Sequence, residues 1–391
     1  MVAMVIGLIG MVIIFQVFEV SEGIKRTTTS GGDAQQNGAI AMYVLEHDVR
    51  NSGMGFNDIV WAGCNIIGYD NMLANPDLPA VGATMLLAPV RIAPGADSKS
   101  PDEVTMIYGS QTHSASQVKL DQTMTQSTDP VRVKSAYGFK TGDLILLMQY
   151  VQPAPPVAPK PCSMMEVTAV NTVFLSHDAG NYSYTPPGGT PVTVPSRFNK
   201  PGGLGVTYET GKSVVYNLGN VRGGGPVMPV YSTYRIQNST LTVTSAFTIG
   251  TPPGVADNIV HMRAVYGLDD GSNNNTVPYN TIFKAGDGIV DSWVPAQPLP
   301  AVPNWTYVKA VRIAIVARSV LKEKPTAGVG APCDTTTTEP TWSGSAWAAA
   351  PLNFNTRLDV SADPDWMCYR YRVFEATIPL RNWVWNSRDT P

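Results

Sequence analysis

The sequence predicts an α+β protein in which a long amino-terminal helix is followed by a large, mainly antiparallel β head with long loops. Three observations lead to this prediction: residues 1–18 carry no charge, no proline occurs before Pro76, and 35 Gly and 32 Pro residues divide the chain into short segments. An apolar start without proline favours a helix, whereas frequent turn residues between short apolar runs favour β-strands.

The apolar run at residues 1–18 suits a bilayer or a bundle of similar helices. Gln16 is its single amide, and the first charge is Glu19. At about 1.5 Å per residue the run covers about 27 Å, close to the roughly 30 Å of a bilayer core. A cleaved signal peptide is disfavoured because no basic residue precedes the run, and a plain single-span anchor stays open. The run begins abruptly, so we expect a few further residues upstream in the natural protein.

Residues 21–52 favour a continuation of this helix that packs on the head. Met42, Leu45 and Val49 recur at spacings of three and four, which places them in one apolar stripe. A helix over residues 1–52 would be about 78 Å long. The pair Gly31-Gly32 and the Thr and Ser residues before it are poor helix formers, so a bend, a break or an extended segment is expected there.

The helix is expected to end at Gly53 and Gly55, because glycine readily takes the left-handed conformation of a C-terminal cap. We therefore divide the chain into a hydrophobic and amphipathic helix over residues 1–53 and a β-rich head over residues 54–391. Residues 56–100 are interpreted as loops with one or two strands. Clearer strand character is found at 102–110, 131–150 with a turn at 140–142, 164–177, 212–219, a hairpin over 232–246 that turns at Asn238-Ser239, 305–320 and 369–380. The pattern at residues 258–268 is compatible with either a helix or a strand.

Composition argues against several classes of function. Charged residues make up 15% of the chain and the net charge is −3, without a basic block, so no nucleic-acid partner is expected. The four His residues are scattered, and neither a GxSxG elbow nor an HExxH motif occurs. We therefore expect no enzyme and no catalytic residues. Trp342 and Trp347, in a segment of small residues, are candidates for a surface that binds a partner.

Five blocks of sequence resemble pilins, and four of them resemble one family in particular. MVAMVIGLIGMVIIFQVF at residues 1–18 is similar to the mature amino-terminal helix of a type IV pilin that lacks its first few residues. LEHDVRNSGMGF (45–56), IVHMRAVYGLDDG (259–271), VKAVRIAIVARS (308–319) and YRYRVFEATIPLRNWVW (369–385) resemble the minor pilins of the PilW type. The glycine cleavage site, aromatic residue and glutamate that precede the helix in that family are not part of this sequence.

Between these blocks the resemblance is weaker. Residues 57–250 share only the family's general character, apart from GDLILLMQ at residues 142–149. This middle part leaves room for other functions, namely a minor pseudopilin of type II secretion or a membrane-tethered, lectin-like adhesin or binding module.

The resemblance implies a structural role in the type IV pilus. Proteins of this type prime pilus assembly at the inner membrane and sit at or near the pilus tip. The implied partners are other minor and major pilins and a tip adhesin. The implied location is the inner membrane, with a single span and the head in the periplasm, and then the cell surface as part of the pilus.

The four cysteines are expected to form two disulfides, because the head would lie outside the cytoplasm. Four cysteines allow three pairings. We favour Cys333 with Cys368, which closes a local loop that carries a Thr-rich insert, and Cys64 with Cys162. Free, buried thiols remain the alternative, since unpaired cysteine is often buried.

Two acidic turns are candidate calcium sites. Asp269, Asp270 and Asn273 cluster in LDDGSNNNT, and Asp287 and Asp291 lie four residues apart in GDGIVDSW. Their side chains offer the oxygen ligands that hard cations need, but neither turn has the spacing of an EF-hand loop. Tight turns select the same residue types. No cofactor other than calcium is suggested by the sequence.

Three small residues in the apolar run form a candidate packing surface for another helix. Ala3, Gly7 and Gly10 lie at spacings of four and three, and therefore share one side of the helix. Membrane helices associate through close packing at such small residues. The alternative is that glycine is simply tolerated in membrane helices.

Overall fold

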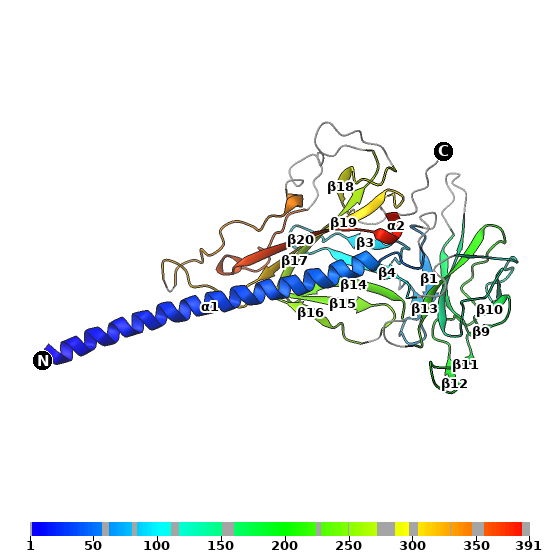
Figure 1. Ribbon diagram of the computed structural model, residues 1–391, viewed down its shortest axis with the longest axis horizontal. Helices are drawn as coiled ribbons and strands as arrows, with labels where there is room; N and C mark the ends of the chain where they lie inside the picture. The colour runs from blue at the N-terminus through cyan, green and yellow to red at the C-terminus, as the bar shows by residue number, and fades with distance from the viewer. Residues whose placement is uncertain are drawn as a thin grey trace.

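The computed structural model contains one long helix that projects from an elongated, β-rich head (Figure 1). It describes residues 2–56, 62–79, 84–110, 117–150, 160–223, 228–248, 250–271, 286–296, 304–328, 330–345 and 356–384. The fold is α+β, with strands that pair almost entirely antiparallel, which confirms the predicted class.

The helix α1 (Val2–Asn51) is continuous, so the break expected at Gly31-Gly32 does not occur. Both glycines face open space, since a Cβ added to either would meet no atom within 4 Å. The residues on either side are buried against the head: Ser30 is 3% exposed and Ala34 is 2% exposed. The Ser30 Oγ accepts a hydrogen bond from the Leu321 N–H at 3.3 Å. Tertiary contacts therefore hold the helix straight where local propensity is poor.

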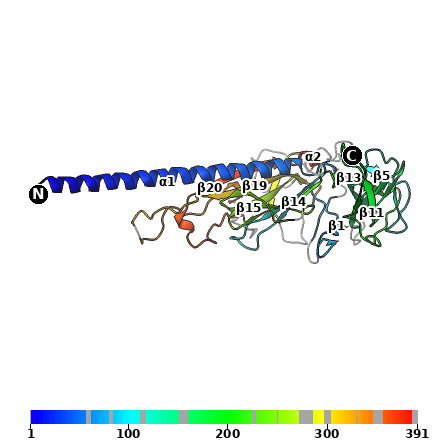
Figure 2. The same cartoon turned by 90° about the horizontal axis from the view of Figure 1, so that it is seen from below.

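Two sheets make up the half of the head that lies along the helix (Figure 2). One has the strand order β16-β15-β14-β4-β3 and the other has the order β18-β17-β19-β20. Their bounds are β3 Val90–Ala93, β4 Glu103–Tyr108, β14 Val230–Gln237, β15 Thr240–Ser245, β16 Gly254–Asp257, β17 Ile259–Leu268, β18 Ser292–Pro295, β19 Val308–Arg318 and β20 Tyr371–Pro379.

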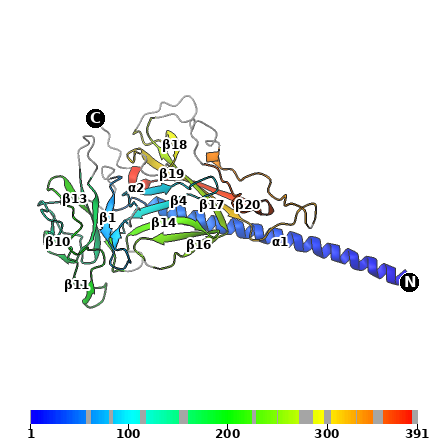
Figure 3. The ribbon, with the colours of Figure 1, turned by 180° about the vertical axis from the view of Figure 1, so that it is seen from behind.

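Three further sheets form the end of the head that is farthest from the helix amino terminus (Figure 3). Their orders are β2-β1-β8-β7-β13-β5, β6-β10-β9 and β11-β12. The bounds are β1 Ile66–Tyr69, β2 Asp77–Leu78, β5 Val118–Lys119, β6 Val131–Arg132, β7 Asp143–Gln149, β8 Cys162–Glu166, β9 Ala169–Val170, β10 Phe174–Ser176, β11 Asn181–Tyr184, β12 Val192–Pro195 and β13 Ser213–Asn220. The short helix α2 (Arg381–Val384) follows β20.

Most predicted strands are found within a few residues of their expected positions. The clearest case is the β14–β15 hairpin, where Asn238 and Ser239 have φ values of 51° and 59°. Positive φ at both central residues gives the tight turn whose twist suits an antiparallel pair. The expectation for residues 56–100 was wrong in number, because β1, β2 and β3 all form there. β1 pairs parallel with β8, a distant partner that local sequence does not reveal.

Both disulfides lie within the described residues, in the pairings that the sequence favours. Cys64, just before β1, pairs with Cys162 at the start of β8, with a Cα–Cα distance of 5.9 Å. Cys333 pairs with Cys368, with a Cα–Cα distance of 4.8 Å. The first bond therefore joins the segment before β1 to the strand that β1 pairs with, and the second closes a loop between β19 and β20.

The carboxyl-terminal half of α1 is part of the main core. Its buried residues are Ala34, Ala41, Met42, Leu45 and Val49, which belong to the same apolar cluster as residues of β17, β19 and β20. The three residues of the predicted stripe are all among them. Gly38 lies on this side of the helix, where an added Cβ would stand 2.0 Å from the Phe374 ring of β20. The helix and the strand can approach this closely only because residue 38 has no side chain.

We predict that Gly38→Ala destabilises the folded chain by about 1–3 kcal/mol, because the new methyl group must displace the Phe374 ring. The matched control is Gly31→Ala, in the same helix but facing open space, which should be neutral or stabilising by up to about 1 kcal/mol. Urea unfolding of the full chain in detergent measures both. Equal effects of the two substitutions would contradict the close packing at Gly38.

Candidate assembly surface on the stem helix

The first part of α1 exposes a continuous apolar surface. Every large apolar side chain from Met4 to Val20 is more than half exposed, from 54% for Ile13 to 77% for Met4. By length and composition the helix can cross a membrane. Apolar area on this scale is unfavourable in water, at roughly 25 cal/mol per Å². Lipid or other helices must therefore cover it.

The small-residue stripe lies open on this surface. At about 100° per residue, Ala3, Gly7 and Gly10 fall within about 60° of each other around the helix axis. A Cβ added to Gly7 or Gly10 would meet no atom within 4 Å. The head therefore makes no use of these glycines, and a partner helix could approach this side of the backbone closely.

The other end of the helix is fixed to the head by hydrogen bonds as well as by apolar contacts. The Asp48 carboxylate accepts hydrogen bonds from the Tyr234 hydroxyl at 2.6 Å and from the Tyr108 hydroxyl at 3.2 Å. Burial and the negative charge of Asp48 raise the pKa of both tyrosines, so both hydroxyls remain donors near neutral pH. The Asn382 side chain donates to the carbonyls of Asn51 and Ser52, each at 3.2 Å, at the helix carboxyl terminus.

A segment between β19 and β20 descends along the helix toward its amino terminus. We call residues 319–328 and 330–333 the strap; it begins after β19 and ends at the Cys333–Cys368 disulfide. The Leu321 N–H binds Ser30, and further along the strap the Lys324 ammonium lies 3.1 Å from the Glu19 carboxylate. Glu19 is eleven residues before Ser30 in the helix, so the strap descends about 16 Å toward the apolar run.

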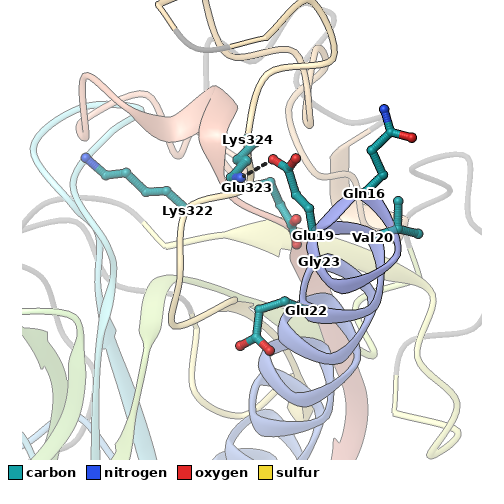
Figure 4. A pocket seen from close by; sticks show the side chains of 8 residues that line it. All are labelled: Gln16, Glu19, Val20, Glu22, Gly23, Lys322, Glu323 and Lys324. Atoms are coloured by element: carbon teal, nitrogen blue, oxygen red, sulfur yellow. Dashed lines mark hydrogen bonds and ion pairs between the residues drawn. The ribbon is translucent and has the colours of Figure 1, made fainter. Parts of the chain in front are cut away.

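The strap and the helix enclose an open cavity of about 640 Å³. Its lining residues come from both elements (Figure 4): Gln16, Glu19, Val20, Glu22, Gly23, Lys322, Glu323 and Lys324. Sequence analysis did not find this site. The signal was present as charges of both signs at residues 19–25 and 322–324, but nothing in the sequence places these segments side by side.

Most carboxylates of the two acidic turns accept hydrogen bonds from backbone N–H groups nearby. Asp269 is fully buried and accepts hydrogen bonds from Gly286 N–H at 2.6 Å and from Gly288 N–H at 2.8 Å. The Asp291 carboxylate accepts from Gly271 N–H at 2.7 Å, while Asp287 accepts from the N–H two residues ahead of it. Asp270 lies 3.3 Å from the Ser292 hydroxyl. In the described ranges no three His, Cys, Asp or Glu side chains gather as a metal site requires, and Asn273 lies outside those ranges.

The interpretation of Trp342 as a partner-binding residue was wrong. Its side chain is 7% exposed and packs with Val265, Val316 and Leu358 in a separate apolar cluster. The indole N–H donates to the Thr356 carbonyl at 2.6 Å. The tryptophan of this segment of small residues therefore packs inward and holds the loop against the sheet. Trp347 lies outside the described residues.

His261 of β17 is buried. Its Nε2 lies 3.0 Å from the Ser98 carbonyl and therefore donates, while no described group bonds its Nδ1. Burial and the nearby charge of Arg263 lower the pKa of His261 to about 4. Arg263 itself is paired with Asp102 at 2.6 Å, and its guanidinium donates to the carbonyls of Asp97, Ser98 and Arg357.

Comparison with known proteins gives one match. Residues 216–382 match the family model PilW, described as the type IV pilus-assembly protein W. The match covers a little under half of the chain, from within β13 to α2, and includes β16, β17, β19 and β20, four of the strands against which α1 packs. It links the chain to type IV pilus assembly. Neither the curated proteins nor the solved structures gave a match.

We predict that a chain lacking residues 1–25 is soluble, folded and monomeric. Among the described side chains of α1, Ser30 is the first that is buried, so this deletion removes little of the core. A deletion through residue 42 is the matched control, because it also removes Ala34, Ala41 and Met42 from the core and should unfold the head. Size-exclusion chromatography and circular dichroism measure the outcome. Aggregation of the chain with the shorter deletion would mean that residues 1–25 contribute to the core of the head.

We predict that the fold loses stability below neutral pH through His261. Unfolded histidine has a pKa near 6.5, so between pH about 6.5 and 4 the unfolded chain binds a proton that the folded chain does not, and stability falls as pH falls, by up to about 3 kcal/mol. His261→Gln should reduce this pH dependence, whereas His47→Gln, on the exposed helix surface, should preserve it. The urea midpoint of unfolding, measured across this pH range, tests the prediction. Identical pH profiles of the midpoint for wild type and His261→Gln would contradict the assignment.

Proposed function

We propose that this chain is a minor pilin that helps to prime type IV pilus assembly and remains at or near the pilus tip. The observation that carries the proposal is an exposed apolar helix rigidly joined to a head region that matches the PilW family model. In this proposal the function is structural rather than enzymatic.

The mechanism is association of helices, first in the membrane and then in the filament. Before assembly, the apolar run spans the inner membrane and the head lies in the periplasm, where the two disulfides suit an oxidising compartment. During assembly the helices of other minor and major pilins replace lipid around the run. Lipid tails are as apolar as leucine, so close packing at small residues supplies the preference for helix over lipid.

The head sets the position of this helix relative to its neighbours. Because α1 is continuous from Val2 to Asn51, force and orientation pass directly from the membrane to the β sheets. The three distal sheets lie at the end of the head opposite to the helix amino terminus, where a tip adhesin would bind (Figure 1). A minor pseudopilin of type II secretion would use a similar helix, but the family match to a pilus-assembly protein favours the pilus.

The packing surface is tested by the double substitution Gly7→Leu and Gly10→Leu. The segment stays hydrophobic, so we expect normal insertion and normal amounts of protein in the membrane. Close approach of a partner helix is blocked, so we expect loss of pili, counted by electron microscopy.

The matched control is Val5→Leu with Val12→Leu, which adds bulk on the opposite side of the same helix and should leave piliation intact. Wild-type piliation in the Gly7→Leu, Gly10→Leu strain, with the protein present in the membrane, would reject the packing role of the stripe.

A further inference from the structure

The cavity between the strap and the helix lies at a defined depth if the apolar run spans a bilayer. Residues 1–18 account for about 27 Å of a hydrocarbon core of roughly 30 Å. The headgroup layer beyond it is about 5–7 Å thick on each side, which corresponds to about three to five helical residues. Glu19, Val20 and Glu22, which line the cavity, fall in this layer, and Gly23 lies at its outer edge. The strap reaches the same depth, because Lys324 contacts Glu19.

The charges around the cavity are of both signs, and all but Glu22 form ion pairs. Glu323 of the strap is bound by Arg370 at 3.2 Å, and Lys322 is bound by Asp365 at 2.5 Å, with its side chain directed away from the helix (Figure 4). Glu19 and Lys324 point toward one another across the opening. Among the described residues Glu22 makes no hydrogen bond or ion pair, and its side chain is exposed.

The Glu19–Lys324 pair is easily opened. Both side chains are largely exposed, at 73% and 68% respectively. An exposed ion pair contributes at most about 1 kcal/mol, so a ligand that replaces both partners loses little. A ligand with a negative group for Lys324 and a positive group shared by Glu19 and Glu22 would give each of the three side chains a partner of opposite charge.

We propose that this cavity binds the headgroup of a zwitterionic aminophospholipid, with its phosphate on Lys324 and its primary ammonium on Glu22 and Glu19. Val20 supplies an apolar contact for the start of the acyl chains, and Gln16 a polar group one turn deeper in the helix. The strap is thereby seated in the headgroup layer and holds the head at a fixed height above the membrane before assembly. The inference rests on the proposed function, which places the apolar run of α1 in a membrane, and it names a ligand for that same helix.

The charge pattern predicts which lipids bind. Phosphatidylethanolamine offers a phosphate and three ammonium donors to carboxylates, so it fits both ends of the site. Phosphatidylglycerol brings only negative charge and would face Glu19 and Glu22 without a counter-ion. Phosphatidylcholine has a positive end without an N–H donor, so it cannot hydrogen-bond the carboxylates.

The test is native mass spectrometry of the full chain in detergent with equimolar phosphatidylethanolamine, phosphatidylglycerol and phosphatidylcholine. We expect the phosphatidylethanolamine adduct to exceed each of the others by about threefold, as expected for exchange of exposed ion pairs. The variant carrying Glu22→Gln and Lys324→Gln should bind the three lipids equally. Its matched control carries Glu209→Gln and Lys212→Gln, which removes an exposed pair in the distal head and should keep the preference.

Several outcomes would overturn the site. Equal binding of the three lipids by the wild type, a preference for phosphatidylglycerol, or an unchanged preference in the Glu22→Gln, Lys324→Gln variant would each do so. In cells, a photocrosslinker at Val20 should capture lipid; capture of another protein chain before assembly would identify a neighbouring helix as the occupant instead.

Failure of the site is distinguishable from failure of the membrane placement. Flotation of the full chain with liposomes reports the placement alone, and piliation in the glycine variants reports assembly. A chain that floats but shows no lipid preference loses only the headgroup site. A chain that does not float overturns the membrane placement and the headgroup site together.

Discussion

The close approach of α1 to β20 is the contact on which the rest of the molecule depends. At Gly38 the helix backbone lies so near the Phe374 ring that no side chain would fit. From there to Val49 one side of the helix is buried in the same apolar cluster as residues of β17, β19 and β20. The hydrogen bonds of Asp48 to two tyrosines and of Asn382 to the last helical carbonyls fix the angle of the helix as well as its position.

Because the carboxyl-terminal half of α1 is fixed to the head, its amino-terminal half can extend away from the head as a helix. An isolated helix is marginal in water, and one with poor formers at residues 27–32 more so. Packing against the head on either side of the glycine pair supplies the helix stability that the local residue types do not provide. The apolar run then extends from a rigid base into whatever covers it, lipid or other helices, with no stabilisation from its own head beyond the strap. The exposed apolar surface of α1 and the rigid attachment of the helix both follow from the packing of its carboxyl-terminal half on the head.

The distal sheets depend on a different kind of constraint. The Arg197 guanidinium binds the buried Asp70 carboxylate through two hydrogen bonds, of 2.8 and 2.6 Å. The equally buried Glu166 accepts hydrogen bonds from Tyr182 and Arg222 and from two backbone N–H groups at Arg197 and Phe198. Buried charges of this kind are tolerated only when fully bonded, and removing one partner is strongly destabilising. They hold together segments that are far apart in the chain.

The sequence by itself determined the features that depend on local pattern. The apolar run, the stripe at Met42, Leu45 and Val49, the β14–β15 turn and the long strand β19 all follow from periodicity and turn chemistry over a few residues. Only the tertiary structure decided the features that depend on distant partners: the straight helix at Gly31-Gly32, the parallel pairing of β1 with β8, the burial of Trp342 and the descent of the strap to Glu19. The physical reason is that these arise from contacts between residues tens to hundreds of positions apart, whose energies outweigh local preference but leave no local pattern in the chain.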